Sequence, residues 1–256
     1  MSVINTNVSS LNAASSLAIN ERNLSTAMER LSTGKRINGA KDDAAGQAIA
    51  SRMTAQIRGL DQAVRNANDG ISMLQTADGA MEEVSNMLQR MRELAVQHGN
   101  DTNVSQDLVA LSTEYQALSS EITRINADTT WNSQELFAAA AVTFQVGANS
   151  GDVISVSITD FALTGTISTL GAIDTDIDNI NTYRSNLGAG INRLTYAANN
   201  ALSISTNTSA SRSRIVDTDY AKVSAELART QIVQQAATAM LAQANQSSQS
   251  VLALLK

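Results

Sequence analysis

The sequence predicts a mainly α-helical fold, a long antiparallel helical bundle or coiled-coil rod with one small β-hairpin. Apolar residues recur three and four positions apart over most of the 256 residues, which is the period of amphipathic helices. There is no proline, which would break a helix, so the composition favours long uninterrupted helices. Aromatic residues make up only 3% of the chain, which favours a thin core between paired helices.

The first and last segments are both predicted to be helices, from about residue 4 to 31 and from about residue 219 to 255. Leucines recur every seventh residue in the first segment, whereas polar Thr230, Gln234 and Ser248 interrupt the stripe of the last. Polar groups in a seam can favour one register. We expect both stripes to bury themselves against each other or against other copies. The predicted assembly seam consists of Leu17, Leu24, Leu31, Leu227, Leu241, Val251 and Leu255.

Residues 32–43 are polar, contain two glycines and lack periodicity, so they predict a non-helical connector. Asp42 or Asp43 would suit the N-cap of the next helix. That helix is predicted from about residue 44 to 97, where a seven-residue apolar line runs without a break. A further helix over 104–125 follows a short link, which predicts an antiparallel helical hairpin.

The apolar period changes to two near residue 141 and stays so to about residue 159, which predicts a β-hairpin around a polar loop. Trp131 is expected to be a buried anchor before it. A third long helix is predicted over 170–201, after which a polar stretch, 203–213, loosens the pattern.

Composition excludes several functions. A net charge of −6 argues against a duplex DNA partner, because neutralising phosphates requires clustered Lys and Arg. The absence of cysteine excludes disulfides and thiolate chemistry. No segment approaches the roughly 20 apolar residues that span a bilayer, and no secretory signal peptide is visible. We find no clustered catalytic residues and expect no enzyme, cofactor or metal. The lone His98 is expected at a helix terminus.

Several long motifs, in order, resemble bacterial flagellin, and the resemblance covers most of the chain. They include Arg-Leu-Ser-Thr-Gly at 30–34 and Lys-Asp-Asp-Ala-Ala-Gly at 41–46. The others are 65–72, 88–97, 211–215 with 219–221, and 241–246. About forty residues separate the two helical halves, between 129 and 169, where long relatives carry outer globular domains. The chain therefore resembles a minimal flagellin that lacks large outer domains.

The resemblance implies a structural subunit that polymerises into the helical flagellar filament for motility. It assigns residues 1–40 to an inner-tube helix and connector, 41–214 to an outer-tube section, and 215–256 to a second inner-tube helix that pairs with the first. It also implies export through the flagellar type III apparatus to the extracellular flagellum. The partners would be other copies of the chain, cap and junction proteins, and an export chaperone at the C-terminal helix.

The resemblance further implies recognition by innate immune receptors. Gln89, Arg90, Leu94 and Glu114 match the surface sensed by Toll-like receptor 5. The alternative is that these four are ordinary filament-packing residues, and both roles can hold.

Residues 29–50 are similar to the flagellin peptide sensed by plant receptor kinases, with Arg30, Asp42, Asp43 and Gly46 as the matching positions. Gln47-Ala48 departs from the usual order of that peptide. The alternative role of the two aspartates is helix capping and a salt bridge to Lys41.

Two other functions remain open from the sequence. One is a hook–filament junction protein, whose terminal segments are similar to those of flagellin. The other is a secreted helical ligand of host receptors, which would form no polymer. Seeded growth of tubes from purified monomer separates the second alternative from a filament subunit.

Overall fold

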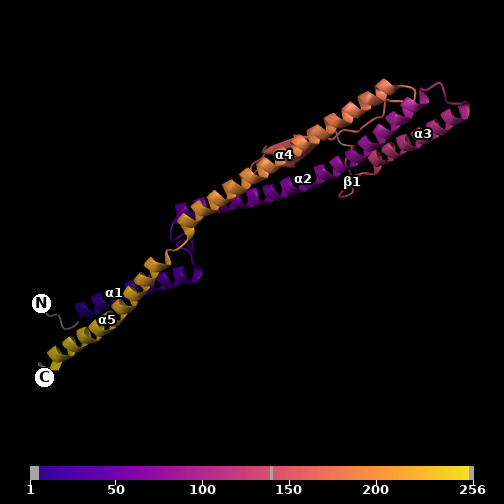
Figure 1. Cartoon of the computed structure of the whole chain (residues 1–256). Helices are drawn as coiled ribbons and strands as arrows, with labels where there is room; N and C mark the ends of the chain where they lie inside the picture. Colours follow the sequence, from indigo (N-terminus) through magenta and orange to yellow (C-terminus); the bar gives the residue numbers. More distant parts are fainter. Residues whose placement is uncertain (1–5, 139–140, 254–256) are drawn as a thin grey trace. The chain divides into compact units, whose positions relative to one another are not determined.

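The computed structural model describes residues 6–138 and 141–253, with side chains described as far as residue 246. Within these residues the chain forms five helices (Figure 1): α1 (Val8–Thr33), α2 (Ala44–His98), α3 (Ser105–Asp128), α4 (Leu170–Val216) and α5 (Tyr220–Ala253). The predicted mainly α-helical class is confirmed. None of these helices is long and apolar enough to cross a membrane.

The chain folds into two compact units. Unit 1 consists of residues 1–54 and 208–256, and unit 2 of residues 55–207. The change from one unit to the other falls inside α2 and α4, whereas the predicted segment boundaries, near residues 40 and 214, fall close to helix ends.

In unit 1 the helices α1 and α5 lie side by side and antiparallel (Figure 1). Asn20 of α1 and Asn7, the residue that caps its N-terminus, donate hydrogen bonds to main-chain carbonyls of α5. Asn20 Nδ2 lies 2.8 Å from the oxygen of Thr230, and Asn7 Nδ2 lies 3.0 Å from the oxygen of Ala244. Asn20 is buried, so slippage of one helix along the other would leave its amide without a partner. The hydrogen bonds of Asn7 and Asn20 thus set the register of the α1–α5 pair.

The connector after α1 is joined to the end of α4 by two main-chain hydrogen bonds. Arg36 N donates to Val216 O at 2.6 Å, and Thr218 N donates to Gly34 O at 3.0 Å. Gly34 ends α1 with φ at +70°, and its N–H bonds to Arg30 O at 3.0 Å. A left-handed residue at this place is usually glycine because it has no Cβ to clash.

Unit 2 has a continuous apolar core between α2, α3 and α4. The seven-residue line predicted on the long helix, from Leu60 to Ala95, is buried at every position. The largest side chains with less than 2% exposure include Leu74, Leu88, Met91, Leu94, Ile122, Ile173, Ile180 and Leu194. Helical periodicity therefore located this core correctly.

The predicted β-hairpin is confirmed as β3 (Val142–Gln145) paired antiparallel with β4 (Val153–Val156), with Val142 opposite Val156. Alternation holds on β4, where Val156 is buried and Ser155 is exposed. The hairpin packs its apolar side chains against the helical core of the unit.

A second, smaller hairpin precedes it and was not predicted. The strands β1 (Thr130–Trp131) and β2 (Gln134–Glu135) have two residues each, too few to show alternation in the sequence. Asn132 and Ser133 turn the chain with φ at 50° and 64°. Trp131 is half-buried, so the prediction of a buried anchor was only partly right.

The polar stretch 203–213 is helical, and α4 runs through it to Val216. The apolar pattern loosens over this stretch, but the helix does not end there. Ser205 is buried, and its hydroxyl donates to Asp61 on α2 at 2.8 Å. A polar side chain with a partner can thus occupy the buried face in place of an apolar one.

Substitution of Gly190 tests the close packing of unit 2. A Cβ at Gly190 would lie 2.9 Å from Val156 Cγ2 and 3.2 Å from Leu74 Cδ1. We expect Gly190→Ala to lower the free energy of unfolding by about 1–3 kcal/mol through overpacking. Gly188→Ala is the matched control on the same helix, because nothing lies within 4 Å of its added Cβ. It should stabilise by up to about 1 kcal/mol through helix propensity.

Urea unfolding followed by circular dichroism measures both variants. Equal effects at the two glycines would contradict the packing described for Gly190.

Candidate assembly and recognition surfaces

The structure brings together Arg90 of α2 and Glu114 of α3. Arg90 Nε and Nη2 both lie 2.9 Å from Glu114 Oε1, and Arg90 Nη1 lies 2.8 Å from Glu93 Oε2. The hydrogen bonds that the Arg90 guanidinium donates to Glu93 and Glu114 raise its pKa further above the ordinary value. Both side chains of the Arg90–Glu114 pair are about half exposed, so solvent screening keeps its contribution to stability small. The pair fixes the direction in which the guanidinium points.

The other two predicted receptor residues differ in exposure. Gln89 is exposed beside Arg90, as a surface residue should be. Leu94 is only 1% exposed and belongs to the core of unit 2. The sequence motif contains both residues, but only the packing of α2 shows which of them reaches the surface.

The predicted plant-receptor positions lie around the connector. Asp43 Oδ1 accepts from Gly46 N at 2.8 Å and so caps α2, as predicted. Asp42 Oδ2 accepts from Asn38 N at 3.0 Å and from Gly39 N at 3.2 Å, which closes the turn before the helix. The backbone hydrogen bond from Asn38 lowers the pKa of the Asp42 carboxyl below its ordinary value of 3.8.

The expected salt bridge to Lys41 is not formed: within the described part of the connector, neither aspartate lies within 4.0 Å of its ammonium. Both carboxylates accept main-chain N–H groups instead. Gly46 is buried, and a Cβ there would lie 2.7 Å from Ile37 Cδ1. Arg30 lies in the last turn of α1 and is half-buried.

The predicted seam residues Leu17, Leu24, Leu31, Leu227 and Leu241 are all half-buried. The side chains of Val251 and Leu255 lie outside the described part of the structure. Other apolar side chains of the pair are largely exposed, among them Leu11 at 61%, Ile232 at 66% and Met240 at 65%. The pairing of α1 with α5 therefore leaves much of their apolar surface open to solvent.

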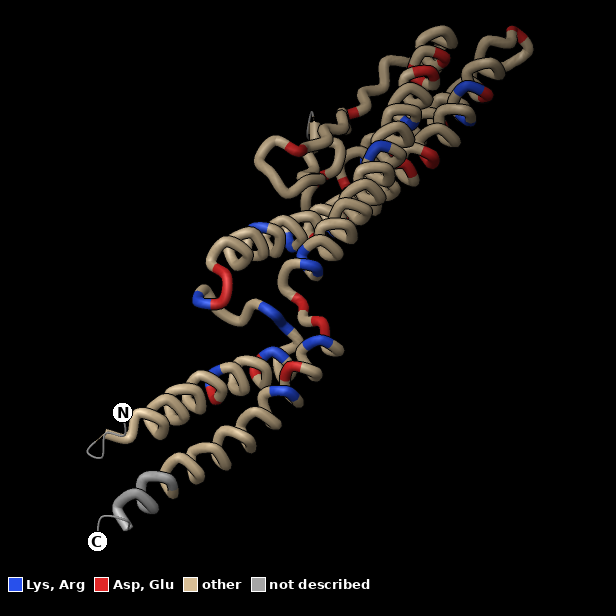
Figure 2. Tube along the Cα trace, turned by 90° about the vertical axis from the view of Figure 1, so that its left-hand side faces the viewer, with Lys and Arg blue, Asp and Glu red and all other residues tan. Residues whose placement is uncertain are grey.

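The same two helices carry almost no charge away from the connector. The sequence has no Lys, Arg, Asp or Glu in residues 1–20 or in residues 230–255. Figure 2 shows the described parts of these lengths, residues 6–20 and 230–246, free of blue and red. We call residues 6–20 and 230–253 the charge-free helix pair. Exposed apolar groups without charges are typical of a surface that another protein copy covers.

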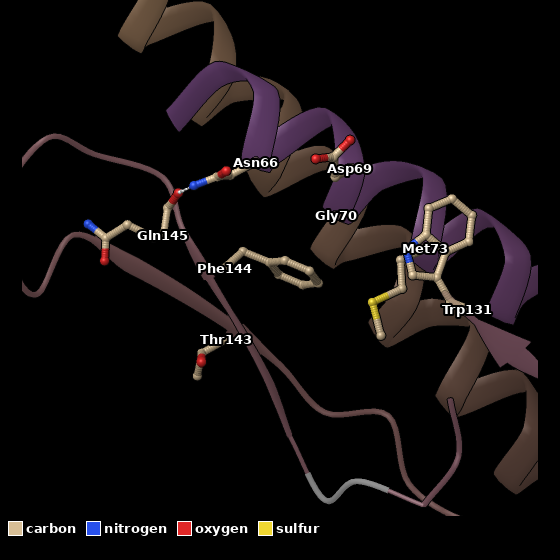
Figure 3. A pocket seen from close by; sticks show the side chains of 8 residues that line it. All are labelled: Asn66, Asp69, Gly70, Met73, Trp131, Thr143, Phe144 and Gln145. Carbon is tan, nitrogen blue, oxygen red and sulfur yellow. Dashed lines mark hydrogen bonds between the residues drawn. The ribbon is translucent and has the colours of Figure 1, made fainter. Parts of the chain in front are cut away.

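Unit 2 also contains a cleft of about 260 Å³ between α2 and β3 (Figure 3). The ring of Phe144 points from β3 toward α2, where Gly70 leaves room for it. Asn66 Nδ2 donates to Gln145 O at 3.1 Å and holds the strand against the helix. The cleft is lined by Asn66, Asp69, Gly70, Met73, Trp131, Thr143, Phe144 and Gln145. Sequence reasoning missed this cleft because its walls on α2 and β3 come from segments at least 70 residues apart.

The described residues contain no cluster of three His, Asp or Glu side chains that could hold a metal ion. His98 is the last residue of α2, at the terminus where it was expected.

Comparison with known proteins places the chain in a family. Residues 4–142 match the bacterial flagellin N-terminal helical region, and residues 170–255 match the bacterial flagellin C-terminal helical region. The chain is 48% identical over 271 residues to a flagellin of Halalkalibacterium halodurans, covering 99% of this chain and 100% of that protein. It is 38% identical over 302 residues to the flagellin of Bacillus subtilis, covering 99% of each.

Among solved structures, the crystal structure of Bacillus cereus flagellin is 32% identical and superposes with a TM-score of 0.49 over 54% of this chain and 88% of that one. The sequence matches to the two helical regions and to the full-length relatives show that the chain belongs to the bacterial flagellins. It is a structural subunit of the flagellar filament, in a short form without an outer globular domain.

The Asp42 turn gives a prediction about pH. Because the folded carboxyl has a lowered pKa, its contribution to stability is present above pH 3.8 and is lost as the pH falls through the lower, folded-state value. We expect the amide resonances of Asn38 and Gly39 to titrate together in NMR, with a midpoint below pH 3.8. Asp42→Ala should abolish this transition. A midpoint at or above 3.8 would contradict the hydrogen bonds described for the turn.

Proposed function

We propose that the charge-free helix pair forms the inner tube of the filament and that unit 2 forms its outer tube. The observation that carries this proposal is the open apolar surface of the charge-free helix pair, whose residues include no Lys, Arg, Asp or Glu. In a filament, neighbouring copies would cover that surface. A charge placed there would lose its water without gaining a partner, at a cost of several kcal/mol.

We also propose that ordering of this pair waits for assembly. Two helices can bury only one face each, and α5 has apolar residues on several sides. An incompletely buried helix pair is marginal in water, because folding must offset the conformational entropy of each ordered residue. The subunit would then be exported in an unfolded form through the flagellar type III apparatus to the cell exterior. An export chaperone would cover the C-terminal helix, and the cap and junction proteins would meet the filament ends. No catalytic activity is part of the proposal.

The inner-tube proposal predicts the effect of a single charge. Ile232 is 66% exposed in the protomer, so Ile232→Lys should change the stability of the monomer by no more than about 0.5 kcal/mol. It should abolish growth on filament seeds, because the ammonium would be buried. Ile232→Met keeps the apolar surface and should retain growth. Sedimentation and electron microscopy measure the polymer; filaments of normal yield from Ile232→Lys would refute the proposed burial.

For the monomer, we propose recognition by Toll-like receptor 5 through the exposed Arg90 and Glu114, with Gln89 beside them. The support is the arrangement of the two charged residues, whose side chains are held together on the surface of α2 and α3. Leu94 is buried in the protomer, so we propose that it supports this surface from below. The same residues would be covered in the polymer, so the receptor would sense free monomer.

A reporter-cell assay tests the receptor proposal. Arg90→Ala should raise the half-effective concentration of monomer by about tenfold, as loss of an exposed arginine anchor does at protein interfaces. Arg124→Ala is the matched control on α3, since Arg124 also pairs with two carboxylates, those of Glu121 and Asp128. Unchanged potency of Arg90→Ala, or an equal loss in both variants, would exclude the proposed site.

We propose that residues 29–50 can act as a plant-receptor ligand once released from the fold. In the protomer Asp43 and Gly46 are engaged in the cap of α2, and Arg30 is half-buried. Such a receptor would therefore bind the segment in an opened or cleaved form. The junction-protein and host-ligand alternatives have no separate observation in their favour.

A further inference from the structure

The two compact units carry opposite charge. Unit 1 contains eleven Lys and Arg against seven Asp and Glu, and unit 2 contains seven Lys and Arg against seventeen Asp and Glu. The net charge of −6 thus divides into an excess of four positive charges in unit 1 and ten negative charges in unit 2. Surfaces of opposite net charge favour contact between unit 1 of one copy and unit 2 of another.

The cleft of Figure 3 is the place in unit 2 that best fits a cationic side chain. Asp69 is exposed on its rim, and no hydrogen bond or ion pair engages the Asp69 carboxylate within the described residues. Trp131 and Phe144 are half-buried and offer aromatic rings, while Met73 adds apolar wall. The aliphatic stem of a lysine or arginine can pack on apolar groups while its charged head meets a carboxylate. An aromatic face adds a cation–π attraction.

We propose that this cleft is a contact site between copies, in which Asp69 and Trp131 receive a Lys or Arg side chain from unit 1 of a neighbouring copy. The inference rests on the proposed function, because it requires an assembled polymer. It adds to that function a specific electrostatic contact made outside the charge-free helix pair.

Unit 1 has cations available for such a contact. Lys35, Lys41, Arg52 and Lys222 are exposed, and within the described residues none of them forms a salt bridge. By contrast, the arginines of unit 2 that pair with carboxylates on a neighbouring helix, such as Arg184 with Asp78 at 2.9 Å, are already engaged. Exposed Arg58 and Arg193 of unit 2 form no salt bridge within the described residues either. We take a second copy as the source of the cation because unit 1 carries the excess of positive charge and a polymer presents many copies of it at high local concentration.

Trp131 makes the proposal directly measurable, because it is the only tryptophan of the chain. Acrylamide quenching of its fluorescence is compared between monomer and sedimented filament of the wild-type protein. We expect the quenching constant to fall at least about twofold on assembly, because a half-exposed indole becomes covered. Equal quenching in the two states would overturn the proposal, even where filaments form in normal yield.

Asp69→Asn tests the charge. It should slow seeded elongation at least about threefold at low salt, and the difference should shrink as salt is raised, because screening weakens the attraction. Asp178→Asn is the matched control, because Asp178 of α4 is also exposed and forms no salt bridge within the described residues. An equal loss in both variants would show an effect of net charge only and would reject the cleft as the site.

Failure of the wild-type chain to elongate on seeds would instead contradict the proposed function itself. Circular dichroism of each monomer shows that the variants are folded. Retained elongation of Asp69→Asn at every salt concentration would also overturn the proposed contact.

Discussion

The limited burial that two paired helices can achieve is the constraint on which the rest of this protein depends. α1 and α5 bury one face against each other. The side-chain amide of Asn20 donates a hydrogen bond to the Thr230 carbonyl, which fixes the register of the two helices. What remains is an uncharged, partly apolar surface that solvent does not favour. In the proposed filament, further copies of the same chain cover this surface.

Unit 2 differs from the helix pair in having a continuous apolar core of its own. Three helices and a hairpin enclose one core, and small residues let them approach closely. Gly70 makes room for Phe144, and Gly190 for Val156. Surface ion pairs such as Arg92 with Asp174 at 2.6 Å add little stability but orient the helices. This rigid frame gives Arg90 with Glu114, and the cleft at Trp131, a defined geometry to present to partners.

The structure also links recognition to folding. Asp43 caps α2, Asp42 closes the connector turn, and Gly46 occupies a space in which a Cβ would clash with Ile37. Leu94 fills the core beneath the Arg90 surface. A receptor directed at these positions would meet residues whose replacement damages the protein's own structure. Such residues are hard to exchange without loss of the fold, whatever their second role.

The sequence by itself determined the helices, the β3–β4 hairpin and the buried line of α2, because periodicity follows from the repeat of each backbone structure. Its motifs also identified the family. Only the tertiary structure decided that α4 continues through residues 203–213, that Leu94 is buried, and that Asp69, Trp131 and Phe144 share one cleft. Local patterns report which face of a helix is apolar. Packing between elements far apart in the chain decides which segment covers that face. It also decides where a buried polar side chain finds its partner, as Ser205 finds Asp61.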